Sequence, residues 1–337
     1  MTATRRIGDS DVYPIGLGCM NLSHAYGAPT EPAAASRLLN EALDLGCNFF
    51  DTATIYGAGE NEKLVAASVG ERRKDIFLAS KCVLDVRDGK RVLDGRPGAI
   101  KAACDASLKR LNTDVIDLYY MHRPDPNVPI EDSVGALSEL VEAGKIRFVG
   151  LSEMGQRLIE RAHAVHPITA VQSEYSLWVR NPEIAVMETC RDLDIALVAF
   201  SPVGRGFLAD PPFDPANMHE KDMRRFFPRF SDENYPGNLD LLDEARACAA
   251  EVGCTVAQLA LAWLLAKGDH VLPIPGTTSS DHLKDNVAAA DVTLDDDMVA
   301  RLDAHFTPES AVGPRYNEQI QATVDTEQFE FETRSSQ

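Results

Sequence analysis

Basic residues are scarce in this sequence, and the shortage limits the partners it can have. Its 337 residues include 33 Lys and Arg against 52 Asp and Glu, which gives a formal net charge of −19. A field of that sign repels the phosphate backbone of a nucleic acid. The longest basic run is Arg72-Arg73-Lys74. We therefore expect no nucleic-acid partner, and we expect local donors to hold any anionic ligand.

Cysteine pairs and long apolar runs are also lacking. The seven cysteines are scattered, odd in number and never spaced as Cys-x-x-Cys, which argues against a disulfide framework and a zinc site. We therefore predict no bound metal. No apolar stretch approaches the length of a membrane span, and no apolar segment follows the start of the chain as in a signal peptide. We expect a soluble, cytoplasmic protein without a membrane partner, and the sequence leaves its oligomeric state unknown.

A dinucleotide-binding turn of the Rossmann type is absent as well. Gly16 and Gly18 lie in an apolar segment, but such a turn needs a third glycine and a helix that opens directly after it. Here a loop over 20–32, rich in Gly, Pro and Ser, comes before the first predicted helix.

What the sequence does contain is a steady alternation of short apolar strands and helices. Continuous apolar strands are expected where both faces of a parallel sheet are buried. Eight strand–helix units favour an α/β fold with a single domain, the (β/α)8 TIM barrel. Periodicity alone leaves an open doubly wound sheet possible. The predicted strands cover 15–19, 48–51, 76–81, 116–122, 146–152, 170–174, 196–201 and 271–275. The predicted helices cover 33–45, 60–69, 97–111, 130–143, 156–164, 182–193, 256–265 and 280–289.

Three segments fall outside this repeat. Extra helices are predicted over 239–252 and 295–304. We assign residues 1–305 to the barrel and 306–337 to a carboxyl-terminal tail. We expect that tail to be only partly ordered, and it is a candidate for one wall of a substrate pocket.

Ionisable side chains end three consecutive predicted strands. Asp51, Lys81 and His122 occupy these ends, and Tyr56 follows the first of them. A barrel brings the carboxyl ends of its strands to one rim, where catalytic groups are placed. A single ionisable residue at a strand end is more often a solvated side chain on the rim, or an aspartate that caps the next turn. Four in adjacent units favour a site.

The chemistry that this set of four predicts is a tyrosine acid. A free phenol has a pKa near 10, and a neighbouring ammonium such as Lys81 lowers it. Asp51 would keep Lys81 charged and in place, and His122 would orient a carbonyl oxygen. Tyr56 could then protonate that oxygen while a hydride reaches the carbon. Because no side chain donates hydride, a nicotinamide cofactor is implied.

These residues resemble the catalytic tetrad of the aldo-keto reductase superfamily. Six short motifs occur in the family's order and span most of the chain. Each motif alone is a weak indication of the family, but all six in the correct order are a specific one. They are Gly16-Leu-Gly-Cys-Met20, Phe50-Asp-Thr-Ala-x-x-Tyr-Gly57, Ser80-Lys81, Asp117-Leu-Tyr-Tyr-Met-His122, Gly144-Lys-Ile-Arg-x-x-Gly-Leu-Ser152 and Ile274-Pro-Gly-Thr277. The segment Val171-Gln-Ser-Glu-Tyr-Ser-Leu-Trp178 is similar to a branch that contains bacterial and fungal reductases of pyridoxal and other aldehydes. That branch also resembles the potassium-channel β subunits.

The resemblance implies an NADPH-dependent carbonyl reductase whose cofactor extends across the barrel rim. By position, Ser152 and Gln172 would hold the nicotinamide carboxamide, and Phe200 would stack on the ring. Ser201 to Gly206 would follow the pyrophosphate with backbone N–H groups. The implied cofactor-binding residues are Met20, Ser152, Gln172, Phe200, Ser201, Val203, Gly204, Arg205, Gly206, Arg224, Gly276, Thr277, His282, Asp285 and Asn286.

Two departures from the family pattern concern the cofactor. Glu153 stands where an asparagine usually follows the serine, and a carboxylate cannot donate to the carboxamide oxygen. The segment over 276–282 lacks the Lys or Arg that many relatives place there for the 2′-phosphate, and it contains Asp281. Arg224, with Arg225 and Lys221, could compensate from the long loop after the seventh strand; equally, that loop could be solvated surface. NADP(H) is therefore favoured, and NAD(H) remains an alternative.

Substrate specificity is expected from the loops over 20–29, 83–96, 123–128 and 210–238, together with the tail. Their aromatic residues could line an apolar pocket or could anchor the loops. These residues are Tyr26, Trp178, Phe226 and Phe227. The predicted function is reduction of an aldehyde or ketone, or the reverse, on a small-molecule substrate. One alternative is a cofactor-sensing partner protein that resembles the channel β subunits and turns over little. Another is a lyase with Lys81 as Schiff base, which Asp51 opposes by keeping the amine protonated.

Overall fold

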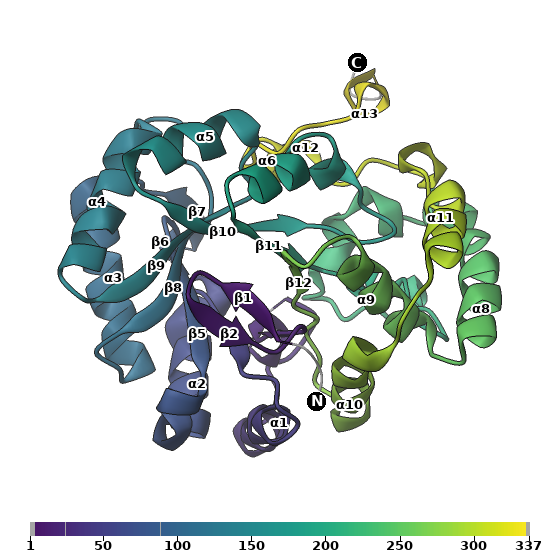
Figure 1. Ribbon diagram of the computed structural model, residues 1–337, viewed down its shortest axis with the longest axis horizontal. Helices are drawn as coiled ribbons and strands as arrows, with labels where there is room; N and C mark the ends of the chain where they lie inside the picture. Colours follow the sequence, from purple (N-terminus) through teal and green to yellow (C-terminus); the bar gives the residue numbers. More distant parts are fainter. Residues whose placement is uncertain (1–3, 24, 88, 335–337) are drawn as a thin grey trace.

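Eight short parallel strands form a ring in the computed structural model, which describes residues 4–23, 25–87 and 89–334 (Figure 1). Their order around the ring follows the order of the chain. Backbone hydrogen bonds from Gly16 N to Pro273 O (3.0 Å) and from Gly18 N to Pro275 O (3.1 Å) join the last strand to the first. The strands are β3 (Leu17–Gly18), β4 (Phe49–Asp51), β5 (Phe77–Cys82), β8 (Ile116–Met121), β9 (Ile146–Ser152), β10 (Ile168–Glu174), β11 (Ala196–Phe200) and β12 (Val271–Pro273). The predicted (β/α)8 barrel is confirmed.

Helices surround the ring on its outer side, one after each strand (Figure 1). They begin where the sequence supplies suitable caps: Pro97 occupies the first turn of one helix, and Thr255 and Gln258 form a capping box on another. The helices of the repeat are α1 (Pro32–Asp44), α2 (Glu60–Val69), α3 (Pro97–Leu111), α4 (Ile130–Glu142), α5 (Gln156–Val165), α6 (Val186–Asp192), α9 (Val256–Ala266) and α10 (Ser280–Ala288). The predicted extra helices are present as α8 (Leu241–Val252), preceded by the short α7 (Tyr235–Leu239), and α11 (Asp296–His305).

A hairpin that the sequence pattern did not predict closes one end of the barrel. Strands β1 (Arg5–Ile7) and β2 (Ser10–Val12) are antiparallel and lie across the barrel opening in Figure 1. Ile7 and Val12 are fully buried in one cluster with interior strand residues such as Phe49. The hairpin therefore fills the amino-terminal end, which leaves the carboxyl ends of the strands for ligands.

Two predicted segments differ in detail from the structure. The first barrel strand is shorter than the predicted 15–19, because only Leu17 and Gly18 pair with β4. The predicted helix over 182–193 is divided into a 3₁₀ turn, Asn181–Glu183, and α6. Ala185 lies between them with extended φ of −153°, which breaks the helical hydrogen-bond pattern.

A second unpredicted hairpin stands beside the open end of the barrel. Strands β6 (Leu84–Arg87) and β7 (Lys90–Leu93) are antiparallel within the segment that we expected to be a specificity loop. The hairpin follows β5 directly, so it lies beside the strand end that carries Lys81.

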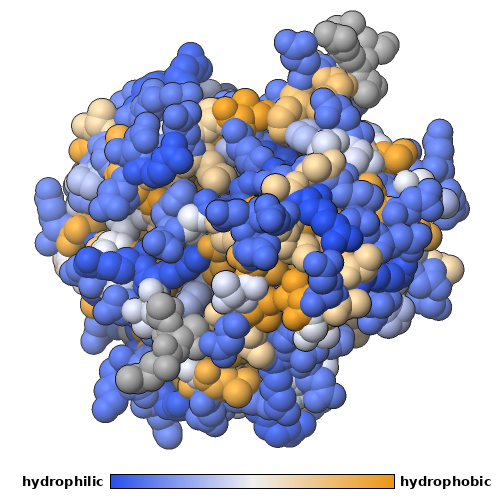
Figure 2. Space-filling view, turned by 45° about the vertical axis from the view of Figure 1, so that its right-hand side comes forward, coloured by the Kyte–Doolittle hydropathy of each residue, from blue (hydrophilic) through white to orange (hydrophobic). Residues whose placement is uncertain are grey.

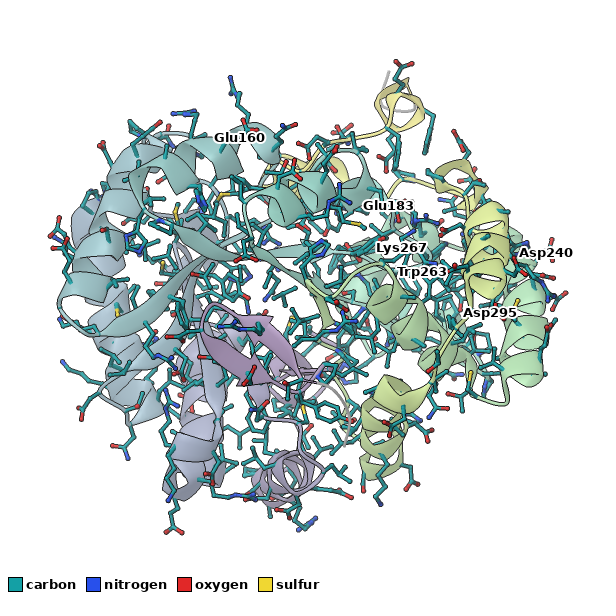
Figure 3. All side chains as sticks on the ribbon, viewed as in Figure 1. Glu160, Glu183, Asp240, Trp263, Lys267 and Asp295 are labelled. Atoms are coloured by element: carbon teal, nitrogen blue, oxygen red, sulfur yellow. The ribbon has the colours of Figure 1, made fainter. Side chains whose placement is uncertain are left out.

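A group of charged and aromatic side chains joins α9 and α11 to the turn after β10. Lys267 Nζ lies 3.0 Å from Asp303 Oδ2 and 3.5 Å from Glu183 Oε1, and it lies over the ring of Trp263. Trp263 Nε1 donates to Asp303 Oδ1 at 3.0 Å. Figure 3 shows Glu183, Lys267 and Trp263 close together between these elements. These contacts fix the outer helices on the side of the barrel from which the tail starts.

The carboxyl-terminal segment folds back onto the open end of the barrel after α11. It contains the short helices α12 (Glu318–Gln321) and α13 (Glu330–Arg334). Asp325 and Glu327 accept hydrogen bonds from Gly155 N (3.3 Å) and Gln156 N (2.7 Å) at the start of α5. The segment therefore makes specific contacts with the barrel at least as far as these residues.

The surface view in Figure 2 shows mostly hydrophilic residues, with apolar residues in smaller groups among them. Within the described ranges, no single helix is long and apolar enough to cross a membrane. The bent pair Tyr235–Val252 and Val256–Ala266, at 83° to each other, meets that criterion only by combined length and composition.

Candidate active site

The four predicted catalytic side chains meet at the open end of the barrel. Asp51 is the last residue of β4, Lys81 lies near the end of β5, and His122 directly follows β8. Tyr56 begins a 3₁₀ turn, Tyr56–Gly59, shortly after β4. All four are buried. Neighbouring parallel strands thus supply three of the groups, and one short loop supplies the fourth.

Lys81 is the centre of this arrangement. Its Nζ forms a short ion pair with Asp51, donates to Thr52 O at 2.9 Å and lies 3.4 Å from Tyr56 Oη. Burial opposes the positive charge, but Asp51 and then Tyr56 raise the pKa of Lys81 above its usual value. The ammonium form is therefore fixed beside the phenol. A Schiff-base role, which requires a neutral amine, is disfavoured.

Tyr56 retains its proton in this setting. Burial raises the pKa of its phenol, and the charge of Lys81 offsets this effect only in part. The predicted lowering by Lys81 is thus present as a contribution, but the net direction is upward because the phenolate would lose hydration. A protonated phenol is the form that a proton donor needs.

His122 is present as a neutral imidazole next to Tyr56. The two rings meet edge to face, with centroids 5.9 Å apart. Burial, followed by the charges of Arg123 and Lys81, lowers the pKa of His122 well below its usual range. Its Nδ1 is buried and has no hydrogen-bond partner among the residues that the structure describes. The ring can therefore offer a hydrogen bond to a ligand without adding a positive charge.

A cavity of about 690 Å³ runs from these residues along the rim. Its volume is within the range of about 300–1,000 Å³ that is usual for ligand sites. Of the predicted tetrad, Asp51, Tyr56 and His122 line it, whereas Lys81 lies behind them. The implied cofactor-binding residues that line the cavity are Met20, Ser152, Gln172, Phe200, Ser201, Val203, Arg205, Gly206, Arg224, Gly276, Thr277, His282, Asp285 and Asn286. Gly204 does not line it; instead it borders a separate small void.

The aromatic residues considered for the substrate pocket divide into two pairs. Tyr26 and Phe227 line the cavity. Trp178 does not: it is buried against Phe207, with stacked rings whose centroids are 4.0 Å apart, and its Nε1 donates to Asn238. Phe226 is also outside the cavity and 65% exposed. For Trp178 the structure therefore favours the alternative of a loop anchor, whereas Phe226 faces solvent and fits neither alternative.

The segment after β11 is shaped for close approach of a ligand to the backbone. Ser201, Gly204, Arg205 and Gly206 all have positive φ values between 51° and 93°. Across the cavity, a Cβ on Gly276 would lie only 2.5 Å from Asn21 Oδ1. Only glycine therefore fits at Gly276 without displacing a neighbouring group. In the segment over 201–206, backbone N–H groups of this left-handed conformation can turn toward an anion.

Two arginines along this segment already have acidic partners. Arg205 Nη2 lies 3.0 Å from Glu174 Oε1, and Arg224 Nη2 lies 2.6 Å from Asp222 Oδ2. Arg224 is buried and its guanidinium stacks on Phe213 at 3.2 Å from the ring centroid. This part of the loop is built into the cavity wall, whereas Lys221 and Arg225 are exposed.

Glu153 turns away from the cavity. Its carboxylate forms a short ion pair with Arg315 of the tail, and it accepts from Glu174 N at 2.7 Å and Thr326 Oγ1 at 3.0 Å. The backbone of Glu153 has a left-handed φ of 54°, a conformation that asparagine adopts more readily than glutamate. Glutamate at this position therefore adopts the left-handed conformation less readily than asparagine would, but it forms a buried ion pair with Arg315 of the tail.

Several cavity residues were not predicted individually. Arg91 comes from β7, Arg123 directly follows His122, and Tyr316 and Ile320 come from the tail. Their segments were all named as candidate specificity loops. No local pattern separates these side chains from their neighbours, because which ones face the cavity depends on the fold of each loop.

Comparison with known proteins identifies the family. The model described as the Aldo/keto reductase family matches residues 14–306. This chain belongs to the aldo/keto reductase family. It is 44% identical over 320 residues to the aldo-keto reductase yakc of Schizosaccharomyces pombe, whose name specifies NADP(+), with 93% of this chain and 94% of the relative covered. The family-level resemblance of the motifs is confirmed.

Solved structures of other aldo/keto reductases share the fold. A glycerol dehydrogenase from Gluconobacter oxydans has a TM-score of 0.81 at 26% identity, covering 94% of this chain and 99% of that one. An aldo-keto reductase from Bacillus halodurans in its holo form has a TM-score of 0.76 at 29% identity, with the same coverage of both chains. An aldo/keto reductase from Klebsiella pneumoniae, in complex with NADP and acetate, has a TM-score of 0.71 at 26% identity. The match again covers 94% of this chain and 99% of that one.

Proposed function

We propose that this aldo/keto reductase is an NADP(H)-dependent carbonyl reductase that converts an aldehyde or ketone to an alcohol, or catalyses the reverse oxidation. The observation that carries the proposal is the position of Lys81 Nζ, paired with Asp51 and 3.4 Å from Tyr56 Oη. A buried phenol next to a fixed ammonium is a proton donor with a stabilised conjugate base. It faces a cavity long enough to hold a second reactant.

In the proposed reaction Tyr56 donates its hydroxyl proton to the carbonyl oxygen. Lys81 stabilises the phenolate that remains, and Asp51 keeps Lys81 charged. Neutral His122 donates a hydrogen bond to the same oxygen and so orients the carbonyl. When bound, the nicotinamide supplies the hydride that completes the alcohol. A proton from solvent then restores the phenol of Tyr56.

The residues around the cavity fit a nicotinamide dinucleotide. Gln172 Nε2 is held by Asp51 Oδ2 at 2.8 Å, which leaves its amide oxygen for a carboxamide N–H. Ser152 Oγ lines the cavity beside it. The segment over 201–206, in which Ser201 and Gly204 to Gly206 are left-handed, suits a pyrophosphate. Thr277 and Asn286 suit the adenosine end. These assignments agree with those implied by the family motifs.

The choice of NADP(H) rests on two observations. The curated relative yakc, at 44% identity, carries NADP(+) in its name. In this chain Arg224 is a cation on the cavity wall, where it can reach a phosphate. Lys284 is not available for that role, because it pairs with Glu41 at 3.2 Å on the outer surface.

The test is a panel of aldehydes, ketones and alcohols assayed with both NADPH and NADH. We expect oxidation of NADPH by at least one class of aldehyde, with weaker activity for NADH. Tight cofactor binding without turnover on any member of the panel would contradict the proposal and would favour a cofactor-sensing role.

A further inference from the structure

Two arginines line the cavity at its catalytic end. Arg123 directly follows His122, and its Nη1 donates to His122 O at 2.5 Å and to Ser152 Oγ at 3.2 Å. Arg91 projects from β7 of the neighbouring hairpin into the cavity wall. Arg123 is half-buried and Arg91 is exposed at the mouth. Hydrogen bonds within the site thus hold Arg123 in place, whereas Arg91 lies at the mouth where a ligand enters.

Among the residues that the structure describes, these two arginines lack the acidic partners that the other cavity arginines have. Arg205 and Arg224 each pair with a carboxylate within 3.0 Å. Within the described ranges, no Asp or Glu lies within 4.0 Å of Arg91 or Arg123 in an ion pair. This is unexpected in a chain with a net charge of −19, in which acidic residues are abundant.

Two acidic residues in neighbouring segments have other partners. Asp94 of the hairpin segment pairs with Arg96 at 2.8 Å and with Arg87 at 3.0 Å. Asp51 pairs with Lys81. Partial burial of its guanidinium and then the like charge of Arg123 lower the pKa of Arg91, so the two guanidinium groups are close enough to repel one another. Among the described residues, the positive charge at this end of the cavity is therefore not paired with a carboxylate.

We propose that the substrate carries an anionic group, a carboxylate or a phosphate, which Arg91 and Arg123 bind while the carbonyl lies against Tyr56 and His122. This inference rests on the proposed function and narrows its substrate class. A guanidinium group presents paired N–H donors that match the oxygens of either anion. Nη1 of Arg123 is held by His122 and Ser152, so the rest of its guanidinium is presented at a fixed position. Arg91, on a hairpin, can adjust to the length of the substrate.

The experiment compares charged aldehydes with neutral analogues of nearly the same shape. The carboxylate pair is 4-carboxybenzaldehyde and methyl 4-formylbenzoate, and the phosphate pair is 4-formylphenyl phosphate and 4-methoxybenzaldehyde. We expect kcat/KM for the charged member of at least one pair to exceed that of its neutral partner by about tenfold or more, chiefly through KM. The preference should fall as salt is added, because Arg91 is solvent-exposed. The pair with the larger ratio identifies the anion.

The variants Arg91→Gln and Arg123→Gln should each reduce that preference, and the double variant should abolish it. In Arg91→Gln the rate with the neutral partner should stay close to that of the unmodified enzyme, which shows that this variant folds and binds cofactor. Because Arg123 contacts His122 and Ser152, the preference of Arg123→Gln and of the double variant is measured against the rate of the same variant with the neutral partner, and NADPH binding followed by nicotinamide fluorescence reports on their fold. Arg123→Lys, which keeps the charge, should retain part of the preference. Lys90→Gln is the matched control, because Lys90 is an exposed neighbour on β7 that does not line the cavity. It should leave the preference unchanged.

Equal kcat/KM for charged and neutral members of both pairs would overturn the inference, as would a preference that survives in the double variant. In either case reduction of the neutral aldehydes would leave the proposed function intact. Failure to turn over any aldehyde, ketone or alcohol, with either cofactor, would overturn both.

Discussion

The catalytic end of the cavity is built from strand ends, whereas its outer wall is built from the loop after β11 and the carboxyl-terminal segment. At the strand ends the ion pair between Lys81 and Asp51 lies beside Tyr56. On the outer wall, buried ion pairs such as Glu153–Arg315 join segments that are distant in sequence. Buried ion pairs therefore differ in what they hold in the two regions: at the strand ends the pair holds an ammonium beside the proposed proton donor, and on the outer wall it holds the tail against the barrel.

The contrast also concerns how each charge is exposed to a ligand. The barrel fixes Lys81 behind the cavity surface, so in the proposed mechanism it acts through Tyr56 and does not touch the substrate. Arg224 lies on the surface of the cavity, so in the proposed cofactor site a phosphate would compete with its partner Asp222. Substitutions in the two regions should therefore change different quantities, catalysis in one and stability or cofactor choice in the other.

Among substitutions of the charged residues in the two regions, the largest effect is expected for Lys81→Met. Removal of the ammonium should lower kcat by at least about 100-fold, since the phenolate of Tyr56 loses its stabilising charge. It also leaves Asp51 buried without its partner, which should lower the free energy of unfolding by about 3–5 kcal/mol. Steady-state kinetics and urea unfolding measure the two effects.

The double variant Asp51→Asn/Lys81→Met separates these effects. It removes both charges, so it should regain much of the stability while activity stays low. Recovery of activity in the double variant would show that Lys81 serves only the fold.

On the outer wall, Arg315→Met should destabilise the protein by about 3 kcal/mol, because Glu153 becomes a buried, unpaired carboxylate. KM for substrate should rise more than kcat falls, since Tyr316 next to it lines the cavity. The matched control is Arg161→Met, whose pair with Glu131 is exposed to solvent and should contribute much less to stability. A loss of stability no greater than in that control would show that the tail pair has no structural role.

The neutral state of His122 predicts how stability changes with pH. Its pKa is well below 6.5 in the folded protein, so only the unfolded chain takes up this proton as pH falls below about 6.5. Its contribution to stability is present above that pH and is lost progressively below it, with a slope of up to about 1.4 kcal/mol per pH unit. Urea unfolding at several pH values between neutral and mildly acidic should show a shallower slope for His122→Asn. Identical slopes would mean that His122 titrates normally in the fold.

The smallest effect is expected for cofactor choice. Arg224→Ala should weaken binding of NADPH by about tenfold and of NADH much less, since only the former carries a 2′-phosphate. Asp222→Asn frees the guanidinium and should strengthen NADPH binding. Arg225→Ala, a change at the exposed neighbour, is the control. Equal losses for the two cofactors in Arg224→Ala would remove it as the phosphate-binding group.

The same contrast governs what could be predicted from the sequence. Asp51, Lys81 and His122 could be placed together because apolar strands of a parallel barrel must present their carboxyl ends on one rim. The hairpin of β1 and β2 could not, because each three-residue strand buries only one residue and so lacks a detectable period. Periodicity therefore predicts the barrel strands and helices that carry the site, but it does not detect strands as short as β1 and β2.

The outer wall depends on contacts that no local pattern reports. Glu153 and Arg315 are 162 residues apart, and their pairing exists only when the tail folds over the barrel. Trp178 is similar in kind to the pocket aromatics, but its indole faces the interior below the loop. Whether an arginine has an acidic partner, as Arg224 has and Arg123 has not, is likewise a property of the folded chain.

The central claim is that Tyr56 donates the proton and has no part in holding the cofactor. Its most direct test is Tyr56→Phe, with NADPH binding followed by nicotinamide fluorescence and reduction followed in a single turnover with an aldehyde that the unmodified enzyme reduces. We predict that reduction falls by at least about a thousandfold while the Kd for NADPH is essentially unchanged. Substantial reduction by the variant, or loss of NADPH binding together with activity, would contradict the claim.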